Sequence, residues 1–201
     1  FIKKYRIPYF NLIALMISSS DILFKKISNS KNLLNSYSKF LEYQSLHKKE
    51  LFINIKKVFD DKKDNITKLK LKNYVFNKGD VKWILDHYIK RSIPFYLSIN
   101  LVKSIVYLKF NKNIFLKTLW SSTFLTTYCY LGIKQIIYTS DKSNIILKIG
   151  LSLPGLALIF ERDKNMRILI SKFCLSMSLY NFIKNNIYDN TYFNLIIHYI
   201  Q

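Results

Sequence analysis

Long apolar segments joined by short polar loops fill the second half of this chain, and they limit what it can fold into. In the stretch Thr118–Ile133 no residue is charged, and most of the polar side chains are the hydroxyls of Ser and Thr. A helix on the surface of a water-soluble protein carries charges on its polar face. Hydroxyl groups instead suit contacts between helices in lipid, because they hydrogen-bond across helices or to their own backbone. The pattern favours helices embedded in a membrane.

The apolar segments approach the length that a bilayer requires. A spanning helix needs about 20 mostly apolar residues, and none of the segments reaches this length without a charge. Several come close if a lysine near an end extends to the lipid headgroups. We therefore predict an all-α fold, a polytopic membrane helix bundle, with residues 92–201 as its membrane domain. The expected segments are about 93–110, 116–138, 145–160, 168–183 and 192–201, and residues 1–24 are a further candidate membrane helix.

The interior of this bundle is the first candidate site. Lys103 lies near the middle of its apolar segment, where a lysine costs about 2.5–3.5 kcal/mol of insertion free energy. Its side chain must therefore face protein or water, and we expect it to mark a polar interior or a lateral cavity. We expect the Ser and Thr side chains to pack the helices together, with Ser121, Ser122 and Thr126 as the main candidates.

A second group of candidate residues follows in the segment 145–160. Pro154 removes a helical hydrogen bond, so it kinks a helix or begins one, and Gly150 and Gly155 allow close approach of a neighbouring backbone. Glu161 and Arg162 then begin a compact polar turn between two apolar segments, which predicts a helical hairpin. These two side chains either pair with neighbouring helices or belong to a solvated turn.

Residues 25–91 differ in composition from the apolar segments: they are rich in Lys and Asn and contain a single Gly. Gly79 is expected to end one helix and Asp80 to cap the next, over Val81–Arg91. We predict a basic helical segment outside the bilayer that meets anionic lipid headgroups, with a merely solvated basic face as the open alternative. An apolar stripe at helical spacing within it consists of Leu51, Phe52, Ile55, Val58 and Phe59.

Composition excludes several classes of protein. The 32 Lys and Arg against 12 Asp and Glu give a net charge of +20, yet half of the chain is hydrophobic, unlike a disordered basic tail. Four Gly argue against a nucleotide-binding fold with phosphate loops, and two Cys exclude a disulfide scaffold.

Basic residues flank both ends of the segment 116–138, so the distribution of charge does not predict its orientation in the membrane.

Three stretches of the second half carry a family resemblance: Pro94, Phe95 and Tyr96; Ser121, Ser122, Thr123, Phe124 and Leu125; and Leu153, Pro154, Gly155, Glu161, Arg162, Lys164 and Arg167. On these residues the block from Ile93 to about Asn186 resembles the transmembrane protein 135-like family, multi-span proteins of peroxisomes and mitochondria distantly related to Tim-type import translocases. The resemblance implies a role in membrane organisation or in lipid or solute homeostasis, with no established chemical reaction. The family's cysteine-rich N-terminal portion has no counterpart here.

Residues that could carry catalysis are scattered along the chain. The three histidines, His47, His87 and His198, have no Cys, Asp or Glu at ligand spacing, and both cysteines lie in apolar segments. No nucleophile elbow or phosphate loop is present in the sequence. We therefore expect no enzyme and no cofactor or metal ion. The expected partners are the lipid bilayer, anionic lipid headgroups, and a second copy of the chain or other membrane proteins, in a mitochondrial or peroxisomal membrane.

Two other interpretations stay open. A soluble basic helical protein that binds nucleic acid, such as an organelle ribosome component, would also be rich in Lys, Tyr and Phe. Its weakness is that the apolar runs are too long and continuous for a surface that follows phosphates, so we do not expect a nucleic-acid partner. In the third interpretation, a lipid-surface scaffold, only residues 7–20 and the basic middle region touch the bilayer.

Overall fold

The computed structural model describes residues 9–28, 35–44, 46, 53–57, 73, 75–76, 79–106, 113–139 and 142–183. Every regular element in these ranges is helical, which confirms the predicted all-α fold. The elements are α1 (Tyr9–Ile27), α2 (Asn35–Gln44), α5 (Asp80–His87), the π-helical turn η2 (Tyr88–Ser92), α6 (Ile93–Val106), α7 (Ile114–Thr139), α8 (Asn144–Ser152), the 3-10 helix η3 (Leu153–Phe160) and α9 (Lys164–Ile183).

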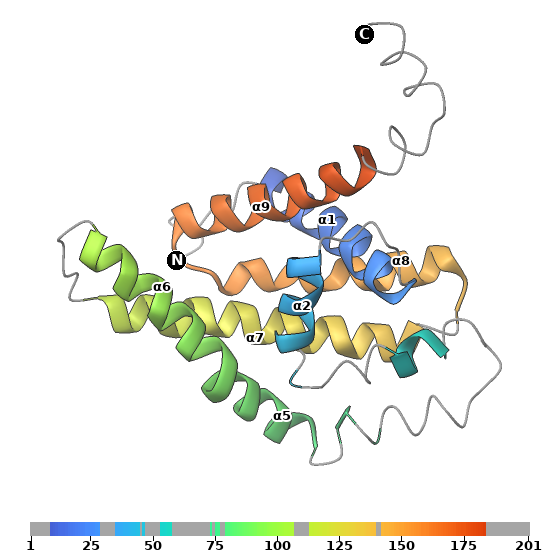
Figure 1. Ribbon diagram of the computed structural model, residues 1–201, viewed down its shortest axis with the longest axis horizontal. Helices are drawn as coiled ribbons and strands as arrows, with labels where there is room; N and C mark the ends of the chain where they lie inside the picture. Colours follow the sequence, from blue (N-terminus) through green and yellow to red (C-terminus); the bar gives the residue numbers. More distant parts are fainter. Residues whose placement is uncertain are drawn as a thin grey trace, which may run out of the picture.

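The helices pack in successive layers around α7. The continuous helix formed by α5, η2 and α6 crosses one side of α7, and α8 with η3 lies along another side. α1 packs on α8 and η3, and α9 packs on α1 (Figure 1). Buried aliphatic side chains from α1, α7, α8 and η3 form the centre of the core, among them Leu15, Ile22, Ile136, Leu147 and Leu158.

The helix that begins at Asp80 does not end at Arg91 as predicted. Gly79 occupies the N-cap position with φ +85°, in the region that favours glycine. Asp80 is therefore the first helical residue, and the prediction that it caps the helix is wrong. Its carboxylate Oδ2 accepts hydrogen bonds from Tyr130 Oη at 2.7 Å and Lys134 Nζ at 2.9 Å, both on α7. Beyond His87 the backbone continues through η2 directly into α6.

The predicted change of structure at Pro154 is present. α8 ends at Ser152, and Pro154 lies in the first turn of η3, where a missing N–H costs no helical hydrogen bond. After η3, the turn at Glu161–Asp163 leads into α9. The turn joins two helical segments, as the hairpin prediction requires, and both η3 and α9 pack on α1.

The expected segments can be compared with the helices. The segment 116–138 lies within α7, 145–160 matches α8 and η3, and 168–183 lies within α9. α6 ends at Val106, and the rest of 93–110 lies outside the described residues, as does all of 192–201. Of the apolar stripe in the basic region, Ile55 is fully buried and the other four residues lie outside the described ranges.

Among the helices that the structure describes, none combines the length with the apolar character that a membrane-crossing helix needs.

Candidate functional site

Hydroxyl side chains of α7 are buried against the neighbouring helices. Ser121, Ser122 and Thr126 are at most 3% exposed. Thr126 takes part in hydrogen bonds to the α5–α6 helix, whereas the Ser122 hydroxyl has no hydrogen-bond partner among the described residues. Elsewhere Tyr128 Oη donates to Ser19 Oγ of α1 at 2.9 Å. These hydroxyls lie at contacts between helices.

A buried polar network lies where α5 meets α6. His87 Nδ1 is 3.1 Å from both Ser92 Oγ and Thr126 Oγ1, and the two hydroxyl oxygens are 2.9 Å apart. A π-helical turn joins residues five apart, so η2 brings Ser92 and His87 together on the side that faces α7. The His87 ring stacks on Trp83, with ring centres 5.1 Å apart.

The surroundings of His87 keep its ring neutral. Burial, with a smaller effect from the charge of Arg91, lowers the pKa of His87 to about 4. The main chain of Gln44 approaches the ring and acts in the opposite direction, although Nε2 makes no hydrogen bond of ordinary geometry with a described residue. A serine beside a histidine resembles a nucleophile and its base. Here both are fully buried, so the network is a packing contact between α5–α6 and α7.

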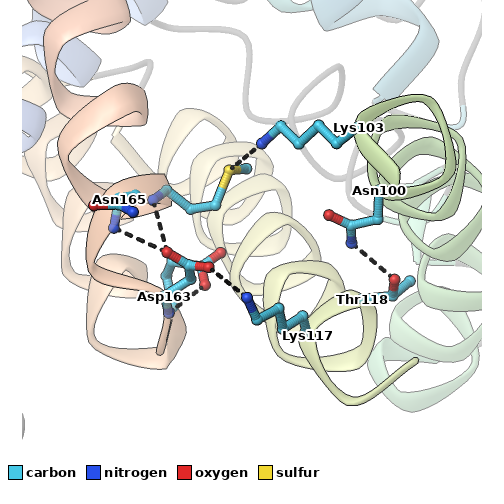
Figure 2. Close-up of polar contacts among 8 residues, drawn as sticks. Asn100, Lys103, Lys117, Thr118, Asp163 and Asn165 are labelled. Atoms are coloured by element: carbon cyan, nitrogen blue, oxygen red, sulfur yellow. Dashed lines mark hydrogen bonds and ion pairs between the residues drawn. The ribbon is translucent and has the colours of Figure 1, made fainter. Parts of the chain in front are cut away.

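A second polar cluster lies where α9 begins, beside the first turns of α7. Lys117 Nζ of α7 is 3.4 Å from Asp163 Oδ2. Asp163 Oδ1 accepts hydrogen bonds from the backbone N–H groups of Asn165 and Met166, at 2.9 and 3.3 Å. Figure 2 shows this arrangement, with Lys103 and Lys117 extending from α6 and α7 toward the beginning of α9.

Glu161 and Arg162 belong to this cluster. Glu161 is 1% exposed, and its Oε1 accepts a hydrogen bond from the Asp163 N–H at 2.9 Å. Burial raises the pKa of Glu161, which the Ser121 hydroxyl, the Asp163 N–H and the charge of Arg167 oppose. Arg162 stacks on Trp120 of α7, with its guanidinium carbon 3.4 Å from the ring centre.

Asp163 itself stays ionised. Its partial burial acts to raise its pKa. The N–H groups of Met166 and Asn165 together with Lys117 outweigh burial, and the pKa of Asp163 lies below its usual value.

Lys103 is directed at α9. Its Nζ donates to Met166 Sδ at 3.3 Å, and one turn earlier Asn100 Nδ2 donates to Thr118 Oγ1 at 2.9 Å (Figure 2). Lys103 itself is exposed, and its ammonium group lies near the polar cluster, not beside Thr126.

The candidate glycines lie at close contacts between helices. A Cβ atom added at Gly155 would be 2.7 Å from both the Cα and the N of Met16, so α1 approaches η3 closely there. At Gly150 the nearest atom would be Thr139 Cγ2 of α7, at 3.0 Å. Pro154 is buried beside them.

The structure thus places the predicted residues in three locations: at the α7 contacts, at the polar cluster and at the glycine contacts. Sequence reasoning missed the network of His87, Ser92 and Thr126, and no periodic signal marks a π-helical turn. It also missed Lys117, Trp120 and Asp163 as neighbours of Glu161. Within the described ranges no group of three or more His, Cys, Asp or Glu side chains could hold a metal ion.

Comparison with known proteins gives no match to a family model, to a curated protein or to a solved structure.

Proposed function

We propose that this chain is a multi-pass membrane protein, a helix bundle whose outer side chains contact lipid and which catalyses no reaction. The observation that carries the proposal is the distribution of polarity. Many Ser and Thr side chains and two charged residues are buried among the apolar core residues, while rows of aliphatic side chains lie on the surface of the bundle. Water-soluble proteins bury apolar side chains and leave most Ser, Thr, Glu and Arg exposed.

The exposed apolar residues form rows instead of isolated positions. Single exposed leucines are ordinary in soluble proteins, but contiguous apolar surface marks contact with a partner or a membrane. On α6 the row comprises neighbours at helical spacing, Leu101, Val102, Ile105 and Val106. Similar exposed residues are Ile145, Ile146, Ile149, Ile159 and Phe160 on α8 and η3, and Leu169, Phe173, Leu179, Tyr180, Phe182 and Ile183 on α9.

Two charged side chains and several hydroxyl groups are buried inside the bundle. Glu161 and Arg167 are at most 5% exposed, although such residues are almost never buried in soluble proteins unless paired. Ser171 Oγ of α9 donates to the Asn11 main-chain oxygen of α1 at 3.0 Å. Hydrogen bonds of this kind satisfy polar groups inside a bundle that is surrounded by lipid.

Helix lengths also support the proposal. The 26 residues of α7 extend about 39 Å, and the 20 residues of α9 about 30 Å. α8 and η3 together extend about 30 Å, because a 3-10 helix rises further per residue. The hydrocarbon core of a bilayer is about 30 Å thick. In the proposed arrangement the hydroxyls of α7, such as Ser121, Ser122 and Thr126, are turned toward other helices.

The biological role is proposed from the resemblance of residues 93–186. It supports membrane organisation or lipid or solute homeostasis in a mitochondrial or peroxisomal membrane. Lysines near the ends of the apolar segments, such as Lys117 and Lys148, suit contact with anionic headgroups.

Alkaline carbonate extraction of organelle fractions tests the proposal. Peripheral proteins dissociate at high pH, whereas a bundle held by its apolar surface stays with the membrane pellet. We expect the intact chain in the pellet, and its release into the supernatant would contradict membrane insertion.

The exposed apolar side chains Tyr9, Phe10, Ile13 and Ile17 of α1 favour a second candidate function, the lipid-surface scaffold. Cysteine-accessibility mapping separates it from the bundle that crosses the membrane. Single cysteines are introduced at Asn113, Lys142 and Asp163, one in each variant. If the chain crosses the bilayer, some of these positions would be labelled from one side of the membrane and the others from the opposite side. Labelling of all three from one side would favour the scaffold.

A further inference from the structure

The short helix α2 is held on the bundle by a few side chains. Among the described helices, none of the pairs that pack closely along one another includes α2. Its attachments are instead an ion pair of Lys26 Nζ, on α1, with Glu42 Oε1 at 2.5 Å, and the contact of the Phe40 ring with Phe95 of α6, with ring centres 5.6 Å apart. α2 therefore rests on the bundle and is not wedged into it (Figure 1).

A small cavity of about 30 Å³ lies beneath α2. Leu41 and Gln44 line it from α2, and the facing walls are formed by α1 and α7, among them Leu23, Cys129 and Gly132. Side chains that border an empty space lose dispersion contacts there. The fit of α2 on the groove between α1 and α7 is therefore loose.

The end of α2 also buries polar atoms without hydrogen bonds. Gln44 is 1% exposed, and neither its amide nitrogen nor its amide oxygen has a hydrogen-bond partner among the described residues. An amide buried in this way loses the hydrogen bonds that water would give it. On the neighbouring η2 the guanidinium of Arg91 lies over the Tyr43 ring, 4.0 Å from its centre, yet its buried Nε also lacks a partner. Attachment of α2 is therefore favoured by ion-pair and ring contacts and opposed by the burial of Gln44.

We infer that α2 is a detachable cover, which lifts from the folded bundle and exposes the groove between α1 and α7. Segments that open locally are those with few packed contacts, and opening returns the Gln44 amide to water. The centre of the core lies in α1, α7, α8 and η3, so these helices keep their packing when α2 leaves. The inference goes beyond the proposed function and does not depend on it.

Hydrogen–deuterium exchange of the full chain in mild detergent, resolved by mass spectrometry of peptides, tests the inference. Amides of a segment that opens locally exchange through that opening, whereas amides of the core exchange only on larger unfolding. We expect the amides of α2 to exchange faster than those in the middle of α7 by about a hundredfold or more. Equal protection of the two helices would overturn the inference.

Two variants of α2 should act in opposite directions. Gln44→Met replaces the unpartnered amide by an apolar side chain of similar size, and exchange of α2 should slow by about tenfold. Glu42→Gln removes the charge that pairs with Lys26, and exchange should become about tenfold faster. Asp86→Asn makes a matched change in the ion pair of α5 with Lys90, and should leave α2 unaffected. Unchanged or faster exchange of α2 in Gln44→Met would contradict the inference.

The thiol of Cys129 reports whether the groove opens together with α2. It lines the cavity, and burial raises its pKa to about 12, so alkylation by iodoacetamide is slow while the cover is closed. We expect alkylation of Cys129 to follow the exchange of α2, slower in Gln44→Met and faster in Glu42→Gln. Cys174, buried on α9, is the internal reference and should react equally slowly in all variants. Parallel changes of Cys129 and Cys174 would show unfolding of the whole bundle and would overturn the inference.

Discussion

Gly155→Ala is expected to lower the stability of the bundle by about 3 kcal/mol, at the upper end of what overpacking costs. The added Cβ would lie 2.7 Å from the Cα and N atoms of Met16. Because these are backbone atoms of α1, no side-chain rotation relieves the clash, and either α1 or η3 must move. For a chain of this size the loss corresponds to a fall in Tm of roughly 6–12 °C. Thermal unfolding in mild detergent, followed by circular dichroism, measures it.

Two other glycines provide a graded control. At Gly132 an added Cβ would meet Leu23 Cδ1 at 3.6 Å, an ordinary contact. Gly132→Ala should therefore leave Tm unchanged or raise it, since alanine favours a helix interior by about 1 kcal/mol. Gly150→Ala, with Thr139 at 3.0 Å, should fall between the two. Met16→Ala should not rescue Gly155→Ala, because the backbone contact remains. A Gly155→Ala variant as stable as the natural chain would contradict the contact of α1 with η3.

Hydrophobic patterning predicted most of the helical segments because burial of apolar side chains at helical spacing is a local property of the sequence. Hence 116–138 and 145–160 correspond closely to α7 and to α8 with η3. Pro154 was equally local in its effect, since its ring excludes one backbone hydrogen bond wherever it lies.

The pairing of helices was not predictable in the same way. The turn after η3 was predicted, but α1, more than 120 residues earlier in the chain, packs on both η3 and α9. The close approach of Met16 to Gly155 depends on that packing. Similarly, one helix was predicted to end at Arg91, whereas η2 keeps the helix continuous, with His87 and Ser92 hydrogen-bonded to Thr126 of α7.

Only part of the candidate site was predicted, because contacts between distant parts of the chain leave no local signal in the sequence. Glu161 and Arg162 were recognised as a polar turn between apolar segments. Their partners Lys117 and Trp120 lie about 40 residues away and carry no signal of their own. Lys103 was expected to avoid lipid on energetic grounds, but its contact with Met166 follows only from the fold.

His87→Gln is expected to reduce the loss of stability that the bundle suffers on acidification. The pKa of His87 is lowered from 6.5 to about 4 in the folded state. Between these values the unfolded chain binds a proton that the folded chain does not, so stability falls as pH falls. One such group contributes about 3 kcal/mol over this range. Most of this contribution should be absent in His87→Gln, measured as the change in unfolding free energy between pH 7 and pH 4.5 in detergent.

The measured pH dependence of stability must distinguish the titration of His87 from the titration of other groups and from the loss of the hydrogen bonds that its ring makes. Glu161 acts with the opposite sign, because its raised pKa makes the folded state bind its proton first as pH falls. That contribution is common to both chains and cancels in their difference. Thr126→Val removes a partner of the His87 ring, so it should lower stability by about 1 kcal/mol at every pH while the pH slope is kept. An identical slope in His87→Gln and the natural chain would show that His87 titrates normally and that its ring is not enclosed by α5, η2 and α7.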